Sequence, residues 1–190
     1  MLYITLTYFI HTSQVKNLST SMLAFDIAQF FPLLNHQLLL ILIKAGFDLK
    51  ILFFFQDYLV GRQTKYLWNN SSFPSFNVDI GVGQWFALSP ILSALYLSLL
   101  LYIFEKQLKN LKILVSILSF IDNGLFIAQN KSLMISNLNL FYSYYIIMFL
   151  LEKFRLIIEY RKMEIFHFSR SYNTFDPLPL DLMLLGDPIL

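Results

Sequence analysis

The sequence predicts an α+β fold in which an antiparallel sheet packs on helices. Short β-type runs alternate along the chain with longer helical stretches and hairpin turns, an order typical of such folds. Of the 190 residues, 57% are hydrophobic and only 14% are charged, and these values exclude intrinsic disorder. The chain contains no cysteine, which excludes disulfides and thiolate metal sites. The length suits one domain.

The first half of the chain predicts one strand, two capped helices and a turn-rich pair of short strands. An apolar run ends at Asp26, as a strand would. Asn35 and Asp48 are residue types that accept hydrogen bonds from helix N-termini, so each marks a helix start. The predicted elements are a strand at 21–27, helices at 35–44 and 48–59, and short strands at 64–68 and 76–80.

The second half predicts two long helices and two hairpins. Ser89-Pro90 combines an N-cap residue with proline at the first helical position, and Ser132 is a second candidate cap. Asp122-Asn123-Gly124 is a strong tight-turn signal between two β-type runs. The predicted elements are helices at 89–108 and 132–154, strands at 112–121 and 125–128, a hairpin-like pair at 156–158 and 163–168, and an extended tail after them.

The low charge keeps a membrane alternative open. Soluble domains carry about one-quarter charged residues, roughly twice the share found here. Two uncharged runs, 80–104 and 132–151, meet the length of about 20 residues that a membrane span needs. Ser89-Pro90 interrupts the first run, and Asn137 and Asn139 would be costly at the middle of the second. A small membrane protein with spans near these runs is therefore an alternative to the α+β domain.

Three segments carry candidate chemistry. Asp26 leaves an apolar strand and is followed five positions later by Phe31. Residues 81–84, Gly-Val-Gly-Gln, precede the helix start at Ser89-Pro90. Asp122 lies at a turn between two apolar strands. Taken singly, each has an ordinary structural explanation as a cap, a helix start or a turn former.

Taken together and in this order, the segments resemble the palm domain of reverse transcriptases of non-LTR (LINE-type) retrotransposons. Asp26 matches the first catalytic aspartate of that family, residues 81–90 match its G-x-x-Q-G-x-x-x-S-P segment, and residues 120–123 match its F-x-D-D turn. Residues 156–164 match a fourth block, L-x-x-E-x-x-K-T-E. The resemblance divides the chain into a short N-terminal remnant at 1–18, a palm-like domain at 19–170, and an extended tail at 171–190 that stops before the primer-grip hairpin.

The resemblance implies an RNA-directed DNA polymerase that copies an RNA template from a DNA primer with deoxynucleoside triphosphates. Such nucleotidyl transfer uses two Mg²⁺ ions, which carboxylate oxygens hold. By resemblance, Asp26 and Asp122 are the metal ligands and catalytic residues. An intracellular location follows from the same resemblance.

The resemblance also implies roles for residues outside the metal site. Phe31 is expected under the incoming sugar, and Gln84 and Ser89 against the nucleotide and template. Lys162 is expected to approach the triphosphate and to protonate the leaving pyrophosphate, and the alternative for it is a solvated hairpin lysine.

The chain departs from the family at positions that matter for catalysis. Asn123 stands where the family has a second aspartate, so metal affinity should fall. Trp85 stands where the family has a glycine that lets the backbone approach the substrate. Fingers and thumb subdomains are largely missing. We therefore expect an inactive fragment of a reverse transcriptase, and the alternative within the family is a non-catalytic palm remnant that binds nucleic acid or nothing.

Overall fold

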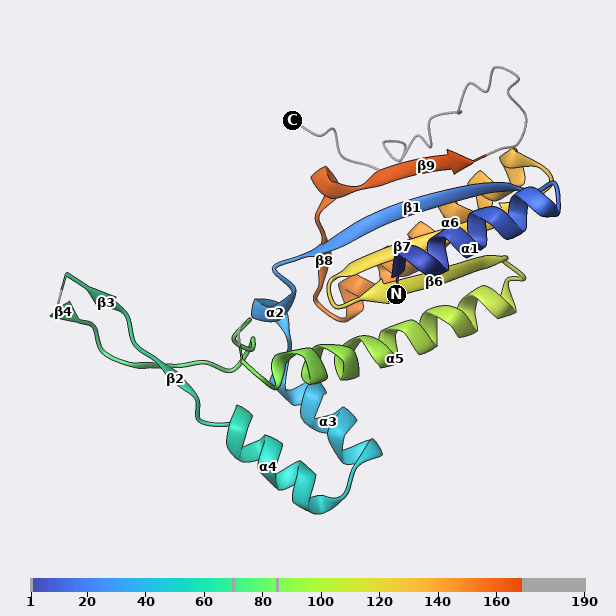
Figure 1. Ribbon diagram of the computed structural model, residues 1–190. Coiled ribbons are helices and arrows are strands. Elements are labelled where there is room, and N and C mark those ends of the chain that lie inside the picture. Colours follow the sequence, from blue (N-terminus) through green and yellow to red (C-terminus); the bar gives the residue numbers. More distant parts are fainter. Residues whose placement is uncertain (1, 70, 85, 169–190) are drawn as a thin grey trace. The chain divides into compact units, whose positions relative to one another are not determined.

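The computed structural model describes residues 2–69, 71–84 and 86–168 (Figure 1). Trp85 and the predicted tail at 171–190 lie outside the described residues. The described residues form helices and an antiparallel sheet, which confirms the α+β class. The chain divides into two compact units: residues 1–28 with 102–190 form the first, and residues 29–101 form the second.

The first unit contains the main sheet, whose central strand is β1. Eight residues of β1 pair in antiparallel register with β7, from Ser19 opposite Asn130 to Asp26 opposite Asn123. The strand order is β6-β7-β1-β8, and β9 also pairs with β1. The strands are β1 (Ser19–Ala28), β6 (Val115–Phe120), β7 (Asn123–Asn130), β8 (Ile157–Ile158) and β9 (Glu164–Phe168).

The hairpin predicted between 156–158 and 163–168 is wrong. The strands β8 and β9 do not pair with each other but with two different stretches of β1. A short 3-10 helix, η1 (Tyr160–Lys162), separates them. Both strands are short, and β1 is long enough to hold them one after the other along the same edge.

Helices cover both faces of this sheet. One face holds Phe25 and Phe126, whose rings lie 4.9 Å apart, and Phe126 stacks at 5.1 Å on Phe104 of α5 (Ser89–Asn110). Helix α6 (Leu133–Lys153) packs against β1 and β7, and α1 (Leu2–Val15) lies over the opposite face (Figure 1). No cap or apolar stripe marks α1 in the sequence, which is why the sequence did not predict it.

The turn between β6 and β7 lies one residue earlier than predicted. The two turn residues are Ile121 and Asp122, and Ile121 has a positive φ of 56°. Asn123 and Gly124 belong to β7. Gly124 is needed there because a Cβ atom at this position would overlap the Phe25 ring. The glycine that signals a turn therefore serves the packing of the sheet.

The second unit contains three helices, the beginning of α5 and a β-arm. Asn35 accepts a hydrogen bond from the Leu38 amide and Asp48 one from the Ile51 amide, both at 3.0 Å, so the caps predicted at these two residues are confirmed. The cap predicted at Ser132 is wrong in its side chain, which makes no capping hydrogen bond to α6. The helices are α2 (Phe30–Leu33), α3 (His36–Gly46) and α4 (Leu49–Leu59). The arm consists of β2 (Gln63–Thr64) paired with β5 (Phe76–Asn77), and β3 (Leu67–Trp68) paired with β4 (Ser71–Ser72).

Candidate active site

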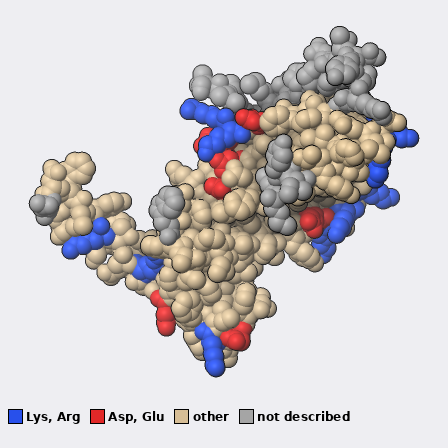
Figure 2. Space-filling model, viewed as in Figure 1, with Lys and Arg blue, Asp and Glu red and all other residues tan. Residues whose placement is uncertain are grey.

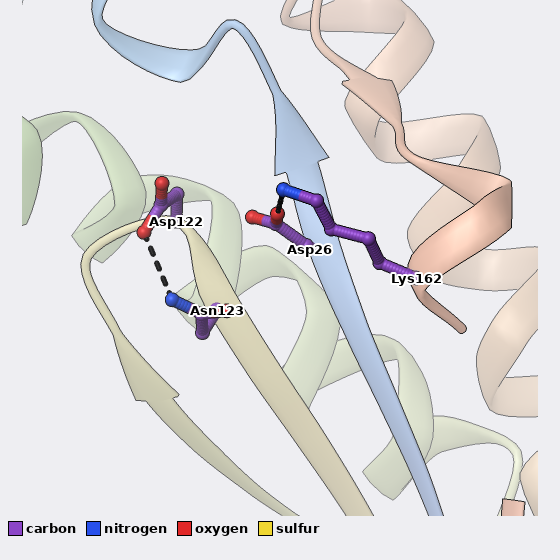
Figure 3. Close-up of polar contacts among 4 residues, drawn as sticks. All are labelled: Asp26, Asp122, Asn123 and Lys162. Atoms are coloured by element: carbon purple, nitrogen blue, oxygen red, sulfur yellow. Dashed lines mark hydrogen bonds and ion pairs between the residues drawn. The ribbon is translucent and has the colours of Figure 1, made fainter. Parts of the chain in front are cut away.

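Two carboxylates meet at one end of the sheet in the first unit (Figure 3). Asp26 lies near the end of β1, directly opposite Asn123 of β7, and Asp122 lies in the β6–β7 turn. The Ile27 amide donates to the Asp122 carbonyl oxygen at 2.9 Å, which fixes the turn against β1. The structure thus brings together three of the predicted site residues from segments about a hundred positions apart.

Lys162 completes this group from the C-terminal side. The Glu159 amide donates to the Asp26 carbonyl oxygen at 2.8 Å, which holds η1 beside β1. The Lys162 ammonium donates to Oδ2 of Asp26 at 2.5 Å, in an ion pair whose lysine side chain is 65% exposed and whose aspartate side chain is 13% exposed. The hydrogen bond to Asp26, together with the aspartate's charge, raises the pKa of Lys162 above its ordinary value.

The remaining oxygens of the two carboxylates differ in their surroundings. Oδ1 of Asp122 accepts a hydrogen bond from the Asn123 side-chain amide at 3.0 Å (Figure 3). Oδ1 of Asp26 is buried and has no hydrogen-bond partner among the described residues. Burying a carboxylate is costly unless it is paired, so the ion pair with Lys162 is the interaction that makes this position tolerable.

An apolar cavity of about 320 Å³ lies beside the ion pair. Asp26, Asn123 and Lys162 contribute its polar lining. The other walls come from α1 and the sheet: Leu6, Ala24, Phe25, Leu118, Phe120, Gly124, Leu125 and Phe166. Among the described residues that line this cavity, the Lys162 ammonium group is the only cation, and it is already paired. The cavity is therefore poorly suited to a polyanion such as a triphosphate.

The donor set at this end of the sheet does not fit a pair of Mg²⁺ ions. Each carboxylate gives one oxygen to a nitrogen donor of the protein, and neither an ammonium nor an amide N–H group can ligate a metal. The described residues contain no group of three His, Asp or Glu side chains that could hold a metal ion. Asn123 directs its amide N–H at Asp122 and adds no carboxylate to the site.

Two other predicted segments come together within the second unit. The Val82 amide donates to the Phe31 carbonyl oxygen at 2.9 Å, and the Gly81 amide to that of Leu34 at 2.7 Å. Gly81 has a φ of 83°, and a Cβ atom there would lie 2.7 Å from the Pro32 carbonyl oxygen. The first and second motifs therefore form one backbone-bonded loop pair in which a side chain at position 81 would not fit.

His36 is a structural residue of this loop pair, and the sequence predicted no contact for it. Its side chain is buried, and Nε2 lies 2.6 Å from the Gly81 carbonyl oxygen. Its position directly after the Asn35 cap is the one local signal, because the cap fixes the start of α3 and so the direction of the first helical side chain. The imidazole bridges the chain between the two motifs, a role that needs tertiary contact to be seen.

The residues predicted to contact nucleotide and template have different surroundings. Phe31 is buried, and Gln84 is exposed in a turn. Ser89 is buried and donates from Oγ to the Gly83 carbonyl oxygen at 2.5 Å, which joins the loop to the start of α5. Their proposed contacts with substrate stay predictions.

The ion pair between Asp26 and Lys162 was not predicted from the sequence. Lys162 was expected to contact a triphosphate or solvent. The register between β1 and β9 contains a signal for this pair. Ala24 lies opposite Glu164, and the same alignment continued by two residues sets Asp26 opposite Lys162. That signal is readable only once β9 is known to pair with β1.

Comparisons with known proteins identify solved structures with a similar fold. No protein-family model and no curated protein matches this sequence. Solved structures do match, among them telomerase from Candida tropicalis in complex with a TWJ fragment of telomeric RNA, with a TM-score of 0.64 and 15% identity. Apo telomerase from the same organism gives 0.60 and 14%, and telomerase from Candida albicans with the RNA fragment gives 0.52 and 14%.

The matches cover most of this chain and a minor part of the telomerases. They include 85%, 88% and 91% of this chain but only 28%, 32% and 31% of the respective telomerase chains. This chain therefore spans less than a third of the length of these three structures. At these identities the likeness shows a shared fold, and it shows nothing finer.

Proposed function

We propose that this chain is part of the palm of a reverse transcriptase, that it descends from a non-LTR retrotransposon, and that it no longer polymerises. The observation that carries the proposal is the meeting of Asp26, at the end of the central strand, with the Asp122–Asn123 hairpin end on the neighbouring strand. The order of the four sequence motifs supports it. The fold shared with telomerase, itself a reverse transcriptase relative, supports it as well.

The residues of the site support the proposed loss of activity. Polymerases of this kind use two metal ions to stabilise the attacking hydroxyl and the leaving pyrophosphate. Here Lys162 compensates the charge of Asp26, and Asn123 supplies an N–H donor where the family carries a carboxylate. These two nitrogen donors therefore occupy carboxylate oxygens that a metal ion would need.

The proposed ancestral partners are an RNA template, a DNA primer and deoxynucleoside triphosphates. An RNA partner is consistent with the telomerase neighbour that was solved with a fragment of telomeric RNA. Binding to a template–primer duplex depends on many contacts between cationic side chains and phosphates. This chain has a net charge of only +2, so we expect any such binding to be weak and salt-sensitive.

Primer extension tests the proposed inactivity. Purified chain is incubated with an RNA template, an annealed DNA primer, deoxynucleoside triphosphates and Mg²⁺ or Mn²⁺. We expect no extended primer, while an active reverse transcriptase run in parallel extends it. Extension that disappears in the Asp26→Asn variant would overturn the inactivity.

The retrotransposon origin has a separate test in the flanking DNA of the gene. We expect coding stretches for the adjoining reverse transcriptase subdomains beside this reading frame, interrupted by stop codons. Flanks without such stretches would contradict the origin and leave the fold assignment intact.

One observation favours a membrane-associated protein as a second candidate. Helices α5 and α6 are long and apolar enough to cross a membrane by length and composition, with 39% and 33% of their apolar windows buried, although core helices of soluble proteins pass the same test. The outer side of α6 exposes a run of apolar residues at helical spacing: Ile135, Leu138, Tyr142 and Phe149. Retention of the expressed chain in carbonate-washed membranes would support this candidate, and full release would exclude it.

A further inference from the structure

Asn123 and Gly124 form the single Asn-Gly pair in the sequence. In such a pair the backbone nitrogen of the glycine can attack the side-chain amide carbon of the asparagine, because the glycine has no Cβ atom to shield that nitrogen. The attack releases the side-chain nitrogen as ammonia, a reaction known as deamidation. Asn123 is the first residue of β7 and lies opposite Asp26 of β1. The pair is therefore located at the end of the sheet that holds the candidate active site.

The packing of the sheet keeps position 124 without a side chain. A Cβ atom at Gly124 would overlap the ring of Phe25. That ring is buried and lies 4.9 Å from the ring of Phe126, so it has little room to withdraw. A side chain at position 124 would shield the attacking nitrogen, and the fold does not accommodate one.

The residue that would be attacked is exposed to solvent. Asn123 is exposed, and its side-chain nitrogen donates to Oδ1 of Asp122 at 3.0 Å (Figure 3). Base and water can therefore reach this end of the hairpin. Both are needed, because the attacking nitrogen must lose its proton and the product takes up water.

A hydrogen bond of the sheet opposes the attack. The Ile27 amide donates to the Asp122 carbonyl oxygen at 2.9 Å. By antiparallel alternation the next hydrogen-bonded pair is Phe25 with Gly124, so the nitrogen of Gly124 is bonded to β1 while the hairpin is closed. This bond lies near the end of β7, where strands open at a smaller free-energy cost than at their centres. Folding therefore slows the attack without preventing it.

We propose that Asn123 is a site of spontaneous deamidation in the folded chain. A base in the solvent takes the proton of the Gly124 nitrogen, which then bonds to Cγ of Asn123. The bond between Cγ and Nδ2 breaks, Nδ2 takes up a proton from water, and ammonia leaves a five-membered succinimide ring. Water then adds to one of the two ring carbonyls, and residue 123 becomes aspartate or isoaspartate. The reaction consumes one water and releases one ammonia, with no change of oxidation state.

Deamidation changes the charges at this end of the sheet. The N–H donor to Asp122 is lost, and a new carboxylate lies beside that of Asp122 and opposite Asp26. Neighbouring carboxylates disfavour each other's charged form, so we expect the modified hairpin end to be less stable. The aspartate product is the residue type that the resembled family has at this position. The proposal does not depend on the proposed function, because it uses only the Asn-Gly pair and its surroundings.

Peptide mapping by mass spectrometry tests the site. The purified chain is incubated at neutral and at mildly alkaline pH, samples are digested at intervals, and fragment ions assign each change to a residue. We expect residue 123 to gain one mass unit, faster at the higher pH because the attacking nitrogen must lose a proton. Asn77 is the internal control, because it is exposed in β5 and is followed by Val78, whose side chain shields the nitrogen. It should keep its mass.

Two variants identify the chemistry. Gly124→Ala shields the attacking nitrogen and should slow the mass gain several-fold. Because this change also strains the packing on Phe25, the variant and the wild type are compared again in denaturant, where the slowing should persist. Asn123→Asp supplies the aspartate product directly. In ion-exchange chromatography it should coelute with one of the acidic species that the incubated wild type forms.

Three outcomes would overturn the proposal. The first is a native chain that keeps its mass at residue 123 while the denatured chain gains it, since the closed hairpin would then prevent the attack. The second is an equal gain at Asn123 and Asn77. The third is a Gly124→Ala chain that reacts as fast as the wild type in denaturant.

Discussion

At the scale of single residues, the chemistry of the candidate active site depends on which hydrogen-bond donors contact its two carboxylates. Asp26 and Asp122 meet as the motifs predict, but each has a protein nitrogen on one oxygen, Lys162 on the first and Asn123 on the second. A carboxylate that is already paired gains less from a cation than a free one. The change of one family carboxylate to asparagine therefore alters the chemistry of the whole group.

Replacing Lys162 should destabilise the fold in a pH-dependent way. The folded state raises the lysine's pKa above 10.5, so the stabilisation is complete below that value and is lost as the pH rises through the folded pKa. We expect Lys162→Met to melt at a lower temperature than wild type at about pH 7, and the two to converge only as the pH rises through the raised pKa of the folded state. Thermal denaturation followed by circular dichroism measures this.

The matched control is Arg161→Met, which removes the charge of the neighbouring exposed residue. It should melt like wild type throughout. Equal losses for the two variants would show that the ion pair with Asp26 contributes nothing specific.

Replacing Gly124 tests the packing of the sheet. The Cβ atom of Gly124→Ala would overlap the Phe25 ring, so the ring must move and we expect a loss of about 1–3 kcal/mol in the free energy of unfolding. Denaturant unfolding measures it. Gly46→Ala, where a Cβ atom meets nothing within 4 Å, should cost nothing. An unchanged stability of Gly124→Ala would contradict the packing described for Phe25.

At the scale of elements, helices were predicted better than strand pairing. The helix starts at Asn35 and Asp48 depend on side chains that bond within three residues of themselves, and both are as predicted. The partners of β8 and β9 depend instead on β1, which lies far away in sequence. Helix α1 carried no local signal, and it forms where it covers one face of the sheet.

The two caps should contribute equally to stability. We expect Asn35→Ala and Asp48→Ala each to lower the free energy of unfolding by about 1 kcal/mol, because each leaves a helix N–H group without its acceptor. Gln37→Ala, an exposed change in the first turn of α3, should have no such effect. Losses as large for Gln37→Ala as for Asn35→Ala, in the same denaturant titration, would speak against capping.

At the scale of the whole molecule, low charge is the dominant property. Figure 2 shows a face that is mostly uncharged, with Lys or Arg and Asp or Glu side chains gathered over the start of β9. Many large apolar side chains of the described residues are exposed, on α6 and on the β-arm among other places. Exposed apolar surface of this kind marks sites that other proteins, other copies or membranes cover.

Restoring the family's residues should not restore polymerisation. Trp85→Gly with Asn123→Asp returns the glycine and the second carboxylate, but the net charge of +2 still offers few contacts to template phosphates. We expect no primer extension by the double variant in the same assay as the wild type. Template-dependent product from it would show that these two substitutions alone caused the loss.

The sequence by itself determined the α+β class, the helix caps at Asn35 and Asp48, and the order of the motifs around Asp26 and Asp122. These features follow from local hydrogen bonds and from residue types, which can be read along the chain. Only the tertiary structure decided that β8 and β9 both join β1, that Lys162 pairs with Asp26, and that β7 is the one strand that pairs with β6 among the described residues. Those outcomes depend on which distant strands compete for the same backbone groups, and that competition is settled only when the sheet is assembled.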